Sequence, residues 1–319
     1  MKPLIVIGGG IAGSALAYFA TQAGIKTVLV DAGKHAASDV PSALINPVRG
    51  QNGHVVEDGL EGAQFTFELL AKLEKLGYNI PHARDGVYRP VPDEKTHLKW
   101  VKNLPPDYPH AWLEQAPEEV HLQSHWHKVL YLPVGGWVDG QAFCTALQEA
   151  SNVQVIRQTA VSFTAHRVVL QDQTELEGTV VFCGGSYGAT LAGIAGTHRR
   201  GSLLLLKETL SEKPVSFGIY ATPARKGGVL GSTFETPETQ FRPSGLPLKS
   251  LHWLMDKAHQ TFSTLDPQFQ GLWTGVRFSG ATLPREVLSL TALGSKGFLL
   301  GPKLASDLVQ NTLIPLLHQ

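Results

Sequence analysis

The sequence predicts an α/β protein in which a parallel sheet carries an inserted, mainly antiparallel sheet. Three observations support this prediction. The chain opens with an apolar run, a glycine-rich turn, a helical stretch and a second apolar run, which is the order of a βαβ unit. Its middle alternates short apolar runs with polar turns, as antiparallel strands do. Its last part ends in a helical pattern of the kind that covers a parallel sheet.

The opening βαβ unit spans residues 4–31. Residues 4–7 and 27–30 are short runs rich in β-branched side chains and predict buried strands, and residues 14–23 have helical spacing. The turn that joins the first strand to the helix reads G-x-G-x-x-G. An acidic residue, Asp31, follows the second strand.

Each glycine of this turn, and the acid, has a separate physical reason. Gly8 permits a tight turn, Gly10 lets the backbone approach a pyrophosphate, and Gly13 lets the helix pack closely on the sheet. The helix N-terminus offers free N–H groups and a positive dipole end to phosphates. The carboxylate of Asp31 can accept hydrogen bonds from both ribose hydroxyls and disfavours a 2′-phosphate. The unit therefore predicts binding of FAD or NAD rather than NADP, and the alternative is a structural glycine turn in another α/β protein.

Composition excludes several functional classes. The chain has 319 residues with 27 basic and 27 acidic side chains, so no net charge favours nucleic acid or an anionic membrane. Two cysteines, Cys144 and Cys183, are too few for a disulfide framework and indicate a reducing compartment. No apolar run reaches the length of a membrane span, and no targeting segment is expected. We expect a soluble cytoplasmic protein, and a peripheral membrane association stays open.

The elements after Asp31 begin with a loop of small residues over 32–47, which suits a large planar ring lying close to the backbone. The alternative is an ordinary flexible surface loop. A strand is predicted over 86–91, a helix over 94–104, and irregular or edge structure over 107–127. A further helix is predicted over 62–76, with one apolar face made by Phe65, Leu69, Leu70, Leu73 and Leu76.

Three histidines in the irregular stretch, His121, His125 and His127, invite a metal-site interpretation, which we reject. No carboxylate or cysteine lies beside them at ligand spacing, and an H-x-H pattern on a polar strand is usually a solvated face. We therefore expect no metal in this protein.

The remaining two thirds of the chain predict strands, two helices and a glycine-rich C-terminal segment. The apolar strand over 179–186 breaks at Gly184 and Gly185, a second point where backbone could meet a dinucleotide. Residues 294–302 predict a glycine-rich loop that leads into a helix over 303–316. Other helices are predicted over 140–150 and 248–262, and other strands over 129–132, 153–156, 160–163, 167–170, 198–206, 217–220, 228–233 and 273–278.

Together these motifs resemble the FAD-dependent D-amino acid oxidase superfamily. The similar branch contains the small-amine oxidases, such as glycine oxidase and sarcosine oxidase, and the flavin-containing half of the bifunctional tRNA wobble-uridine methylaminomethyl biosynthesis enzyme. The resemblance spans nearly the whole chain. Its carriers are VIGGGIAGSALAYFATQAGIKTVLVDAG at the start, the small residues 37–43, PVGGWV at 133–138, the strand ending in GGS at 186, Arg200-Gly201, Tyr220-x-x-Pro223, residues 230–233, Trp273-x-Gly275-x-Arg277, and GSKGFLLGP at 294–302.

The resemblance implies a Rossmann-type FAD-binding domain with an inserted, mainly antiparallel-sheet substrate domain. Residues 1–82, 135–201 and 276–319 would form the FAD-binding domain, and residues 83–134 and 202–275 the substrate or cap domain. The isoalloxazine ring would face the antiparallel sheet. No cysteine stands in the C-terminal loop where sarcosine oxidase attaches its flavin, so noncovalent FAD is expected, and His35 is the alternative attachment point.

The resemblance also assigns site residues. Arg277 matches the arginine that holds a substrate carboxylate through its planar fork, and Tyr220 the tyrosine that assists it. The alternatives are an interface ion pair for Arg277 and a buried sheet aromatic for Tyr220. A positive charge or dipole at the N1/O2 edge of the ring, from Lys296 or backbone N–H groups, favours hydride uptake. Cofactor contacts are implied for Gly8, Gly10, Ile11, Ala12, Gly13, Asp31, Ala32, Val161, Gly184 and Gly185 along the adenosine and pyrophosphate, and for Ser42, Ala43, Ser295, Lys296, Gly297 and Phe298 near the ring.

The chain also departs from the family pattern. It has Pro41-Ser42-Ala43 where small residues usually end in glycine, it lacks the glutamine that usually follows Arg200-Gly201, and residues 46–49 suggest no role. The expected function is oxidation of the C–N bond of a small amine or amino acid by hydride transfer to flavin N5, with no nucleic-acid partner. The alternatives are a tRNA wobble-uridine modifying FAD oxidase and a non-catalytic FAD-binding subunit. The electron acceptor, the substrate and the oligomeric state stay open.

Overall fold

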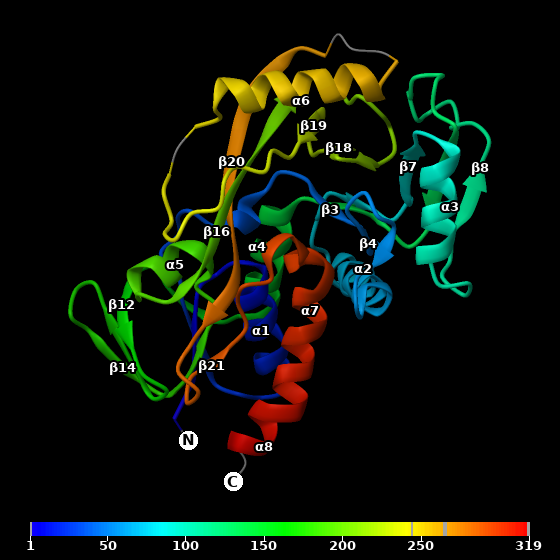
Figure 1. Ribbon diagram of the computed structural model, residues 1–319. Coiled ribbons are helices and arrows are strands. Elements are labelled where there is room, and N and C mark those ends of the chain that lie inside the picture. Colours follow the sequence, from blue (N-terminus) through cyan, green and yellow to red (C-terminus); the bar gives the residue numbers. More distant parts are fainter. Residues whose placement is uncertain (1, 244, 264–266, 318–319) are drawn as a thin grey trace.

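A five-stranded parallel sheet and an eight-stranded, mainly antiparallel sheet organise the fold (Figure 1). The computed structural model describes residues 2–243, 245–263 and 267–317. The predicted fold class is confirmed, because the parallel sheet carries the opening βαβ unit and the antiparallel sheet comes from the middle of the chain. Within the described residues, no helix has both the length and the apolar character needed to cross a membrane.

The parallel sheet gathers strands from distant parts of the sequence in the order β11-β2-β1-β15-β21. The strand predicted over 179–186 ends earlier than expected, because the helix α5 (Gly185–Leu191) begins at the double glycine. The predicted strands at 4–7 and 27–30 are confirmed. The bounds are β1 Leu4–Ile7, β2 Thr27–Val30, β11 Gln154–Ile156, β15 Thr179–Phe182 and β21 Leu288–Ser289.

Both faces of the parallel sheet are covered, which explains why its strands are apolar throughout. Leu4 and Val6 belong to one core cluster with the helices α1 (Ile11–Gln22), α4 (Gly140–Ser151) and α7 (Gly297–Leu308). Ile5 and Ile7 belong to a second cluster with a small sheet on the other face. That sheet contains β12 Ala160–Phe163, β13 Arg167–Leu170 and β14 Glu175–Glu177.

The helix α2 (Gly59–Lys75) differs from its prediction in one part of its buried face. Leu69, Leu70 and Leu73 are buried as expected. Leu76 is 60% exposed because it lies just beyond the helix, and Phe67 rather than Phe65 enters the core. The prediction that Phe65 and Leu76 belong to the buried face of this helix was therefore wrong.

The eight-stranded sheet has the order β20-β16-β19-β18-β17-β7-β9-β8, and only β17 and β7 pair in parallel. The helix α6 (Leu248–Thr261) covers one side of it (Figure 1). The single strand predicted over 217–220 is wrong, because Gly218, with φ of 75°, turns the chain between two strands. The strands are β7 Val87–Val91, β8 Ala111–Leu113, β9 Lys128–Leu132, β16 Ala195–Leu206, β17 Val215–Phe217, β18 Ile219–Pro223, β19 Gly228–Gly231 and β20 Phe269–Thr282.

Shorter elements join the two sheets. The loop predicted over 32–47 contains a 3-10 turn at Ala37–Asp39 and the strand β3, so it is more ordered than a flexible surface loop. The strands β16 and β20 run without a break across the predicted domain boundaries at 201 and 275, so the domain division remains a prediction. The other elements are β3 Ala43–Ile45, β4 Val48–Arg49, β5 His54–Val55, β6 His82–Ala83, β10 Gly136–Val138 and α3 Glu94–Asn103.

The C-terminal segment contradicts the predicted glycine-rich loop over 294–302. A 3-10 turn, Gly294–Lys296, leads directly into α7, which contains Pro302. Proline has no N–H to donate to the carbonyl four residues before it, here that of Phe298. The hydroxyl of Thr66 donates to this carbonyl instead, at 3.0 Å, which lets the helix pass through the proline. A π-helical turn, Val309–Leu313, and α8 (Ile314–Leu317) follow.

Candidate active site

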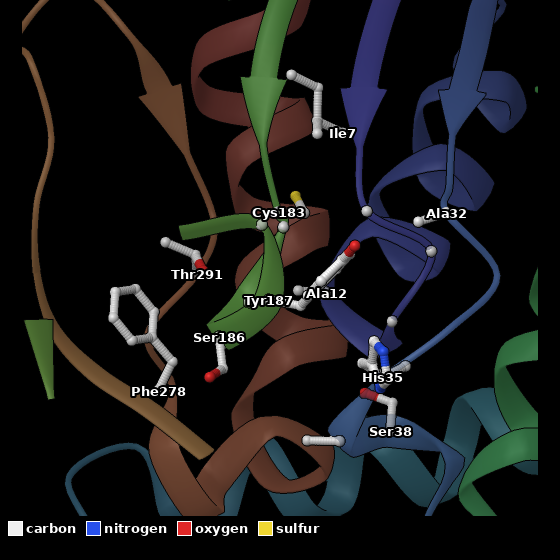
Figure 2. Close-up of a pocket in the computed structure, with 18 of the residues that line it drawn as sticks. Ile7, Ala12, Ala32, His35, Ser38, Cys183, Ser186, Tyr187, Phe278 and Thr291 are labelled. Carbon is white, nitrogen blue, oxygen red and sulfur yellow. The ribbon is translucent and has the colours of Figure 1, made fainter. Parts of the chain in front are cut away.

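A first cavity of about 160 Å³ lies at the carboxyl ends of β1, β2 and β15. Open α/β sheets bind ligands at this edge. Figure 2 shows Ala32, His35 and Ser38 on one side of the cavity and Ser186, Phe278 and Thr291 on the other. The glycine-rich turn lies between them and contributes backbone rather than side chains to the wall.

The turn holds its backbone so tightly that side chains are excluded. Gly8 has φ of 104°, and a Cβ there would lie 2.6 Å from the carbonyl oxygen of Cys183. A Cβ on Gly13 would lie 1.8 Å from the carbonyl oxygen of Gly8. A Cβ on Gly10 would lie 3.1 Å from Ser38 Oγ. The first turn of α1 therefore presents a bare main chain to the cavity, as pyrophosphate binding requires.

Two side chains fix this turn. The Gly9 N–H donates to Asp31 Oδ1 at 3.1 Å, and the Ile11 N–H donates to Ser38 Oγ at 3.0 Å. Asp31 also pairs with the guanidinium of Arg157. Asp31 thus lies at the end of β2 as predicted, with its carboxylate beside the turn.

A second cavity of about 480 Å³ adjoins the first. Arg277, Tyr220 and Trp273 line it from the eight-stranded sheet, and Ala43 and Phe298 line it from the other side. Six residues line both cavities, so the two spaces meet: Ile11, Ala37, Ser38, Arg277, Gly294 and Gly297.

Arg277 is a partly buried cation without an acidic partner among the described residues. Its Nη2 donates to the carbonyl of Thr233 at 2.8 Å, and its Cζ lies 4.3 Å from the ring centroid of Phe234. Gly201, on the neighbouring strand β16 and paired with Gly275, makes room for it, because a Cβ there would lie 2.0 Å from Arg277 Nη2. Burial lowers the pKa of Arg277, Arg199 adds to this effect and Tyr220 opposes it. Among the residues that the structure describes, the interface ion pair that was the alternative for Arg277 is not found.

Tyr220 lines the second cavity, but its hydroxyl donates to the carbonyl of Ser42 at 3.1 Å. Burial raises the pKa of Tyr220, an effect that Arg277 opposes, so the phenol stays protonated. This contact fits a sheet aromatic with a satisfied hydroxyl. A role in binding a carboxylate remains a prediction, because it requires Tyr220 to exchange this hydrogen bond.

The chain matches the model of the FAD dependent oxidoreductase family over residues 3–310. The chain belongs to this family. It is an FAD-dependent enzyme. The glycine-rich turn fits the cofactor, because a Cβ at Gly8 or at Gly13 would collide with neighbouring backbone, so the turn keeps its main chain bare. That FAD is held without a covalent bond remains a prediction.

Curated relatives in this family include tRNA 5-methylaminomethyl-2-thiouridine biosynthesis bifunctional proteins. The one from Shewanella loihica is 28% identical over 155 residues, which are 44% of this chain and 22% of that protein. The one from Maricaulis maris is 24% identical over 351 aligned positions, which cover 99% of this chain and 53% of that protein. The chain therefore spans about half or less of the length of these relatives.

Solved structures of FAD-dependent oxidoreductases share the fold. Glycine oxidase from Bacillus cereus has a TM-score of 0.79 at 19% identity and covers 98% of this chain and 95% of its own. Iminodiacetate oxidase from a Chelativorans species has a TM-score of 0.79 at 16% identity, with the same coverage. L-alpha-glycerophosphate oxidase from Mycoplasma pneumoniae, with FAD bound, has a TM-score of 0.72 at 17% identity and covers 97% and 94%. At these identities the likeness establishes the fold.

The structure brings most of the predicted FAD contacts to the two cavities. Exceptions are Gly13, which lies under the turn, Ser42, whose hydroxyl is bonded to Thr222 and the Pro223 carbonyl, and Val161, whose neighbour Ala160 lines the first cavity instead. Lys296 lines neither cavity. The predicted residues that do line a cavity are Gly8, Gly10, Ile11, Ala12, Asp31, Ala32, Ala43, Gly184, Gly185, Tyr220, Arg277, Ser295, Gly297 and Phe298.

Other lining residues were not predicted as part of the FAD site. Tyr187 follows the double glycine by two positions and could have been found from that motif. His35, considered earlier as an attachment point, packs its ring 5.0 Å from that of Tyr187 and 4.9 Å from that of Phe241. Phe234 and Gln51 line the second cavity, and no sequence motif marked them.

The segment 46–49, which suggested no role in the sequence, continues into Gly50 and Gln51, and residues of this stretch form a wall of the second cavity. The guanidinium of Arg89 donates to the carbonyls of Val48 and Gly50 and stacks 4.8 Å from the ring centroid of Trp100. The indole N–H of Trp100 donates to the carbonyl of Gln51 at 2.9 Å. Arg89 is 1% exposed, and burial lowers its pKa to about 10. A buried cation thus holds the main chain of the wall.

Replacing Arg89 with methionine is expected to lower the free energy of unfolding by about 2–5 kcal/mol, because the buried carbonyl of Val48 and the carbonyl of Gly50 lose their donor and the packing on Trp100 is lost. The KM of the reaction should rise as well, since the released segment walls the second cavity. Chemical denaturation and steady-state kinetics measure the two effects. The matched control is Arg84→Met, because Arg84 is an exposed arginine near the same sheet. Equal stability of the two variants would contradict this role of Arg89.

A buried histidine gives the fold a pH dependence. Ser186 Oγ and His198 Nδ1 lie 2.7 Å apart, and Ser186 lines the first cavity. Burial lowers the pKa of His198 below its ordinary value of 6.5, and Glu238 opposes this shift. Below pH 6.5 the unfolded chain therefore binds a proton that the folded chain does not, so stability falls as the pH falls through this window.

His198→Gln is expected to reduce this loss of stability on the acid side of pH 6.5. Unfolding curves on both sides of that pH measure the effect, and His166→Gln, at an exposed histidine, is the control. An unchanged pH dependence in His198→Gln would show that another group causes it.

One reason given against a metal site is wrong. We expected no carboxylate near His127 at ligand spacing, but the fold brings Glu94 and His97 beside it. His127 Nε2 lies 2.7 Å from Glu94 Oε2. The sequence could not show this, because Glu94 and His97 lie on α3 whereas His127 lies on a loop beyond the next strand, β8.

Proposed function

We propose that this enzyme oxidises the C–N bond of a small amine or amino acid that carries a carboxylate, with a hydride passing to flavin N5. The observation that carries this proposal is Arg277. It is a partly buried guanidinium without an acidic partner among the described residues, and it lines the point where the two cavities meet. An unpaired cation that is partly removed from water is costly, and an anionic ligand offsets that cost.

The residues that would hold FAD follow the two cavities. The bare turn at Gly8 and Gly10 receives the pyrophosphate, Asp31 the ribose, and the second cavity the ring. FAD supplies a hydride acceptor when it is bound. Gly297 and Phe298 begin α7 and line the second cavity, so the positive end of this helix faces it. This dipole takes the role that Lys296 was expected to share, because Lys296 lines neither cavity.

Arg277 would bind the substrate carboxylate and fix the carbon that loses the hydride. Its Nη1 lies 3.4 Å from Ser232 Oγ, a weak contact that a carboxylate can replace. Two charge-assisted hydrogen bonds from the planar fork then set both position and orientation. The aromatic rings of Trp273 and Phe234 line the same cavity and offer apolar surface to the substrate.

The charges of the second cavity also favour the reactive form of the amine. Among the described residues, Arg277 is the one ionised side chain in its lining, and no carboxylate lines it. A substrate ammonium would therefore lack a counter-ion and face a like charge, which lowers its pKa. The neutral amine, which can release a hydride from its carbon, is favoured at the site.

The test is to supply a panel of amines and follow both electron transfer and product. Glycine, N-methylglycine and an N-carboxymethyl amine are paired with methylamine and dimethylamine, which lack the carboxylate. Oxygen and an artificial acceptor are offered separately, because the physiological acceptor is open. We expect turnover with carboxylated members and formation of the oxo acid and amine that follow imine hydrolysis. Equal turnover of the uncarboxylated amines would contradict the proposal.

A second candidate is a tRNA wobble-uridine modifying oxidase, which is supported by the curated relatives that the chain matches. Against it, the chain has no net positive charge to attract RNA. A tRNA that carries a carboxymethylaminomethyl base distinguishes the two. Turnover of this tRNA without turnover of small amines would favour the second candidate. A coloured protein that no amine reduces would favour the non-catalytic alternative.

A further inference from the structure

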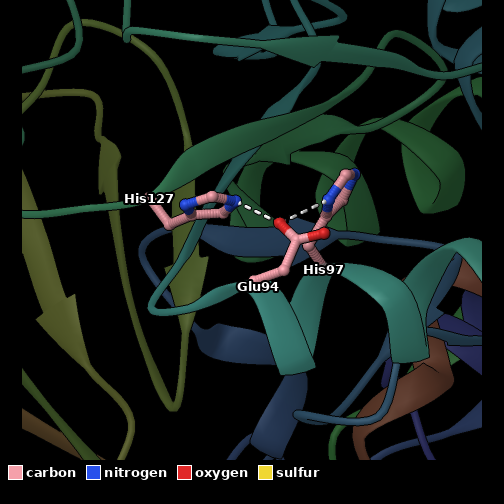
Figure 3. Close-up of side chains that lie close together, drawn as sticks. All are labelled: Glu94, His97 and His127. Atoms are coloured by element: carbon pink, nitrogen blue, oxygen red, sulfur yellow. Dashed lines mark hydrogen bonds and ion pairs between the residues drawn. The ribbon is translucent and has the colours of Figure 1, made fainter.

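Three potential metal-ligand atoms lie close together near the β8 edge of the eight-stranded sheet. They belong to Glu94, His97 and His127 (Figure 3). His127 Nε2 lies 2.7 Å from Glu94 Oε2, and His97 Nδ1 lies 3.4 Å from the same oxygen. All three ligand atoms lie within 4.8 Å of one another. None of these residues lines either cavity of the FAD site.

We propose that these three residues form a binding site for a divalent transition-metal ion, with Zn²⁺ as the best match. Ligand atoms about 2.0–2.2 Å from a tetrahedral zinc ion lie roughly 3.4 Å from each other. Two of the separations are 2.7 and 3.4 Å and all lie within 4.8 Å, so rotations of the side chains can bring the three atoms to that spacing. Two imidazoles and one carboxylate suit Zn²⁺ rather than Mg²⁺ or Ca²⁺, which prefer oxygen ligands alone.

The backbone and a neighbouring ring hold the ligands in place. Glu94 and His97 stand three residues apart at the start of α3 and so share one face of the helix. Asp93 caps this helix, because its Oδ1 accepts a hydrogen bond from the Thr96 N–H at 2.7 Å. The ring of Trp112 packs edge-on to that of His97, with centroids 4.5 Å apart. The site therefore needs little reorganisation to receive an ion.

Because the three side chains are partly exposed, a water molecule can reach a bound ion. His97 is 17% exposed and His127 is 35% exposed, while Glu94 is 58% exposed and faces solvent. A tetrahedral ion with three protein ligands keeps its fourth position for water. Glu114 lies nearby in an ion pair with Lys128, so this pair adds no net charge to the surroundings.

The bound ion would fasten α3 to the start of β9, since His127 directly precedes Lys128. The helix α3 in turn holds the segment that follows the wall of the second cavity. Asn103 Nδ2 donates to the carbonyl of Asn52 at 2.6 Å, and Lys99 Nζ donates to Asn52 Oδ1 at 2.6 Å. The ion is therefore expected to stabilise this part of the fold rather than to take part in the redox reaction.

The test is a Zn²⁺ titration of the untagged FAD-loaded protein by calorimetry, together with the absorption spectrum of the Co²⁺-substituted form. We expect one equivalent to bind, Co²⁺ to give the visible bands of nitrogen and oxygen coordination, and thermal unfolding to shift upward. Glu94→Gln, His97→Gln and His127→Gln should each weaken binding by at least about tenfold, the loss caused even by outer partners of metal ligands.

Two control variants make the test specific. His252 forms a surface pair with Asp256, its Nε2 lying 3.4 Å from Asp256 Oδ2, but this pair lacks a third ligand, so His252→Gln should not change binding. His125→Gln removes a histidine close in sequence whose ring packs on Trp126, and it should not change binding either. The proposal is overturned if no equivalent binds, or if His125→Gln weakens binding as much as His127→Gln does.

Discussion

Replacing Arg277 with methionine is expected to lower kcat/KM for a carboxylated amine by about 30- to 5,000-fold. This range corresponds to the loss of about 2–5 kcal/mol when one partner of a buried, hydrogen-bonded charge pair is removed. Methionine keeps the length and much of the volume of the side chain, so the space beside Gly201 and the ring of Phe234 stays filled. Steady-state kinetics with glycine-type substrates measure the effect.

The matched control for this change is Arg199→Met. Arg199 lies opposite Arg277 in the pairing of β16 with β20, yet it lines neither cavity. We expect it to alter kcat/KM far less than Arg277→Met. A substrate without a carboxylate provides a second control, because the two enzymes should then differ little. A loss of the same size with both kinds of substrate would show that Arg277 supports the fold rather than the carboxylate.

Gly13→Ala is expected to abolish retention of FAD and to destabilise the parallel sheet. The added methyl group would lie 1.8 Å from the carbonyl oxygen of Gly8, so either α1 or the turn must move. Overpacking of this kind costs about 1–3 kcal/mol or more. The displaced turn would also lose the main-chain approach that the pyrophosphate requires. Flavin absorbance per mole of protein after desalting, together with thermal unfolding, measures both effects.

Gly245→Ala is the control for this prediction, because nothing lies within 4 Å of a Cβ at that position. It should keep its flavin and its unfolding temperature. Wild-type flavin content in Gly13→Ala would contradict the account of the turn, since the backbone could then accept a side chain without losing the cofactor.

The parts of the fold that could be predicted are those whose signals are local. The strands at 4–7 and 27–30 are continuous buried runs, and Gly13 is constrained by the carbonyl of Gly8 in the same turn, although the space at Gly8 is limited by Cys183 at the end of the distant strand β15. The C-terminal segment shows the limit. Its glycines and Pro302 suggested a loop, but Thr66 supplies the hydrogen bond that the proline cannot, and this contact joins residues 232 positions apart.

The candidate site was predictable only in part, namely where its signals are local. Arg277 was identified from a motif, but its environment depends on Gly201 across the strand pair and on the absence of acidic neighbours among the described residues. Residues 46–49 gave no signal, because the place of this segment and of Gln51 in the cavity wall depends on Arg89 and Trp100. Ala160 rather than Val161 lines the first cavity. Successive side chains of a strand point to opposite faces, so an error of one position moves the predicted contact out of the cavity.

The most direct test of the central claim is to mix the FAD-loaded protein with an N-carboxymethyl amine under exclusion of oxygen and follow the flavin absorbance band. The account predicts that the band bleaches in wild-type protein and in Arg199→Met, and far more slowly in Arg277→Met. A band that persists with every carboxylated amine, or that bleaches equally fast in Arg277→Met, would contradict it.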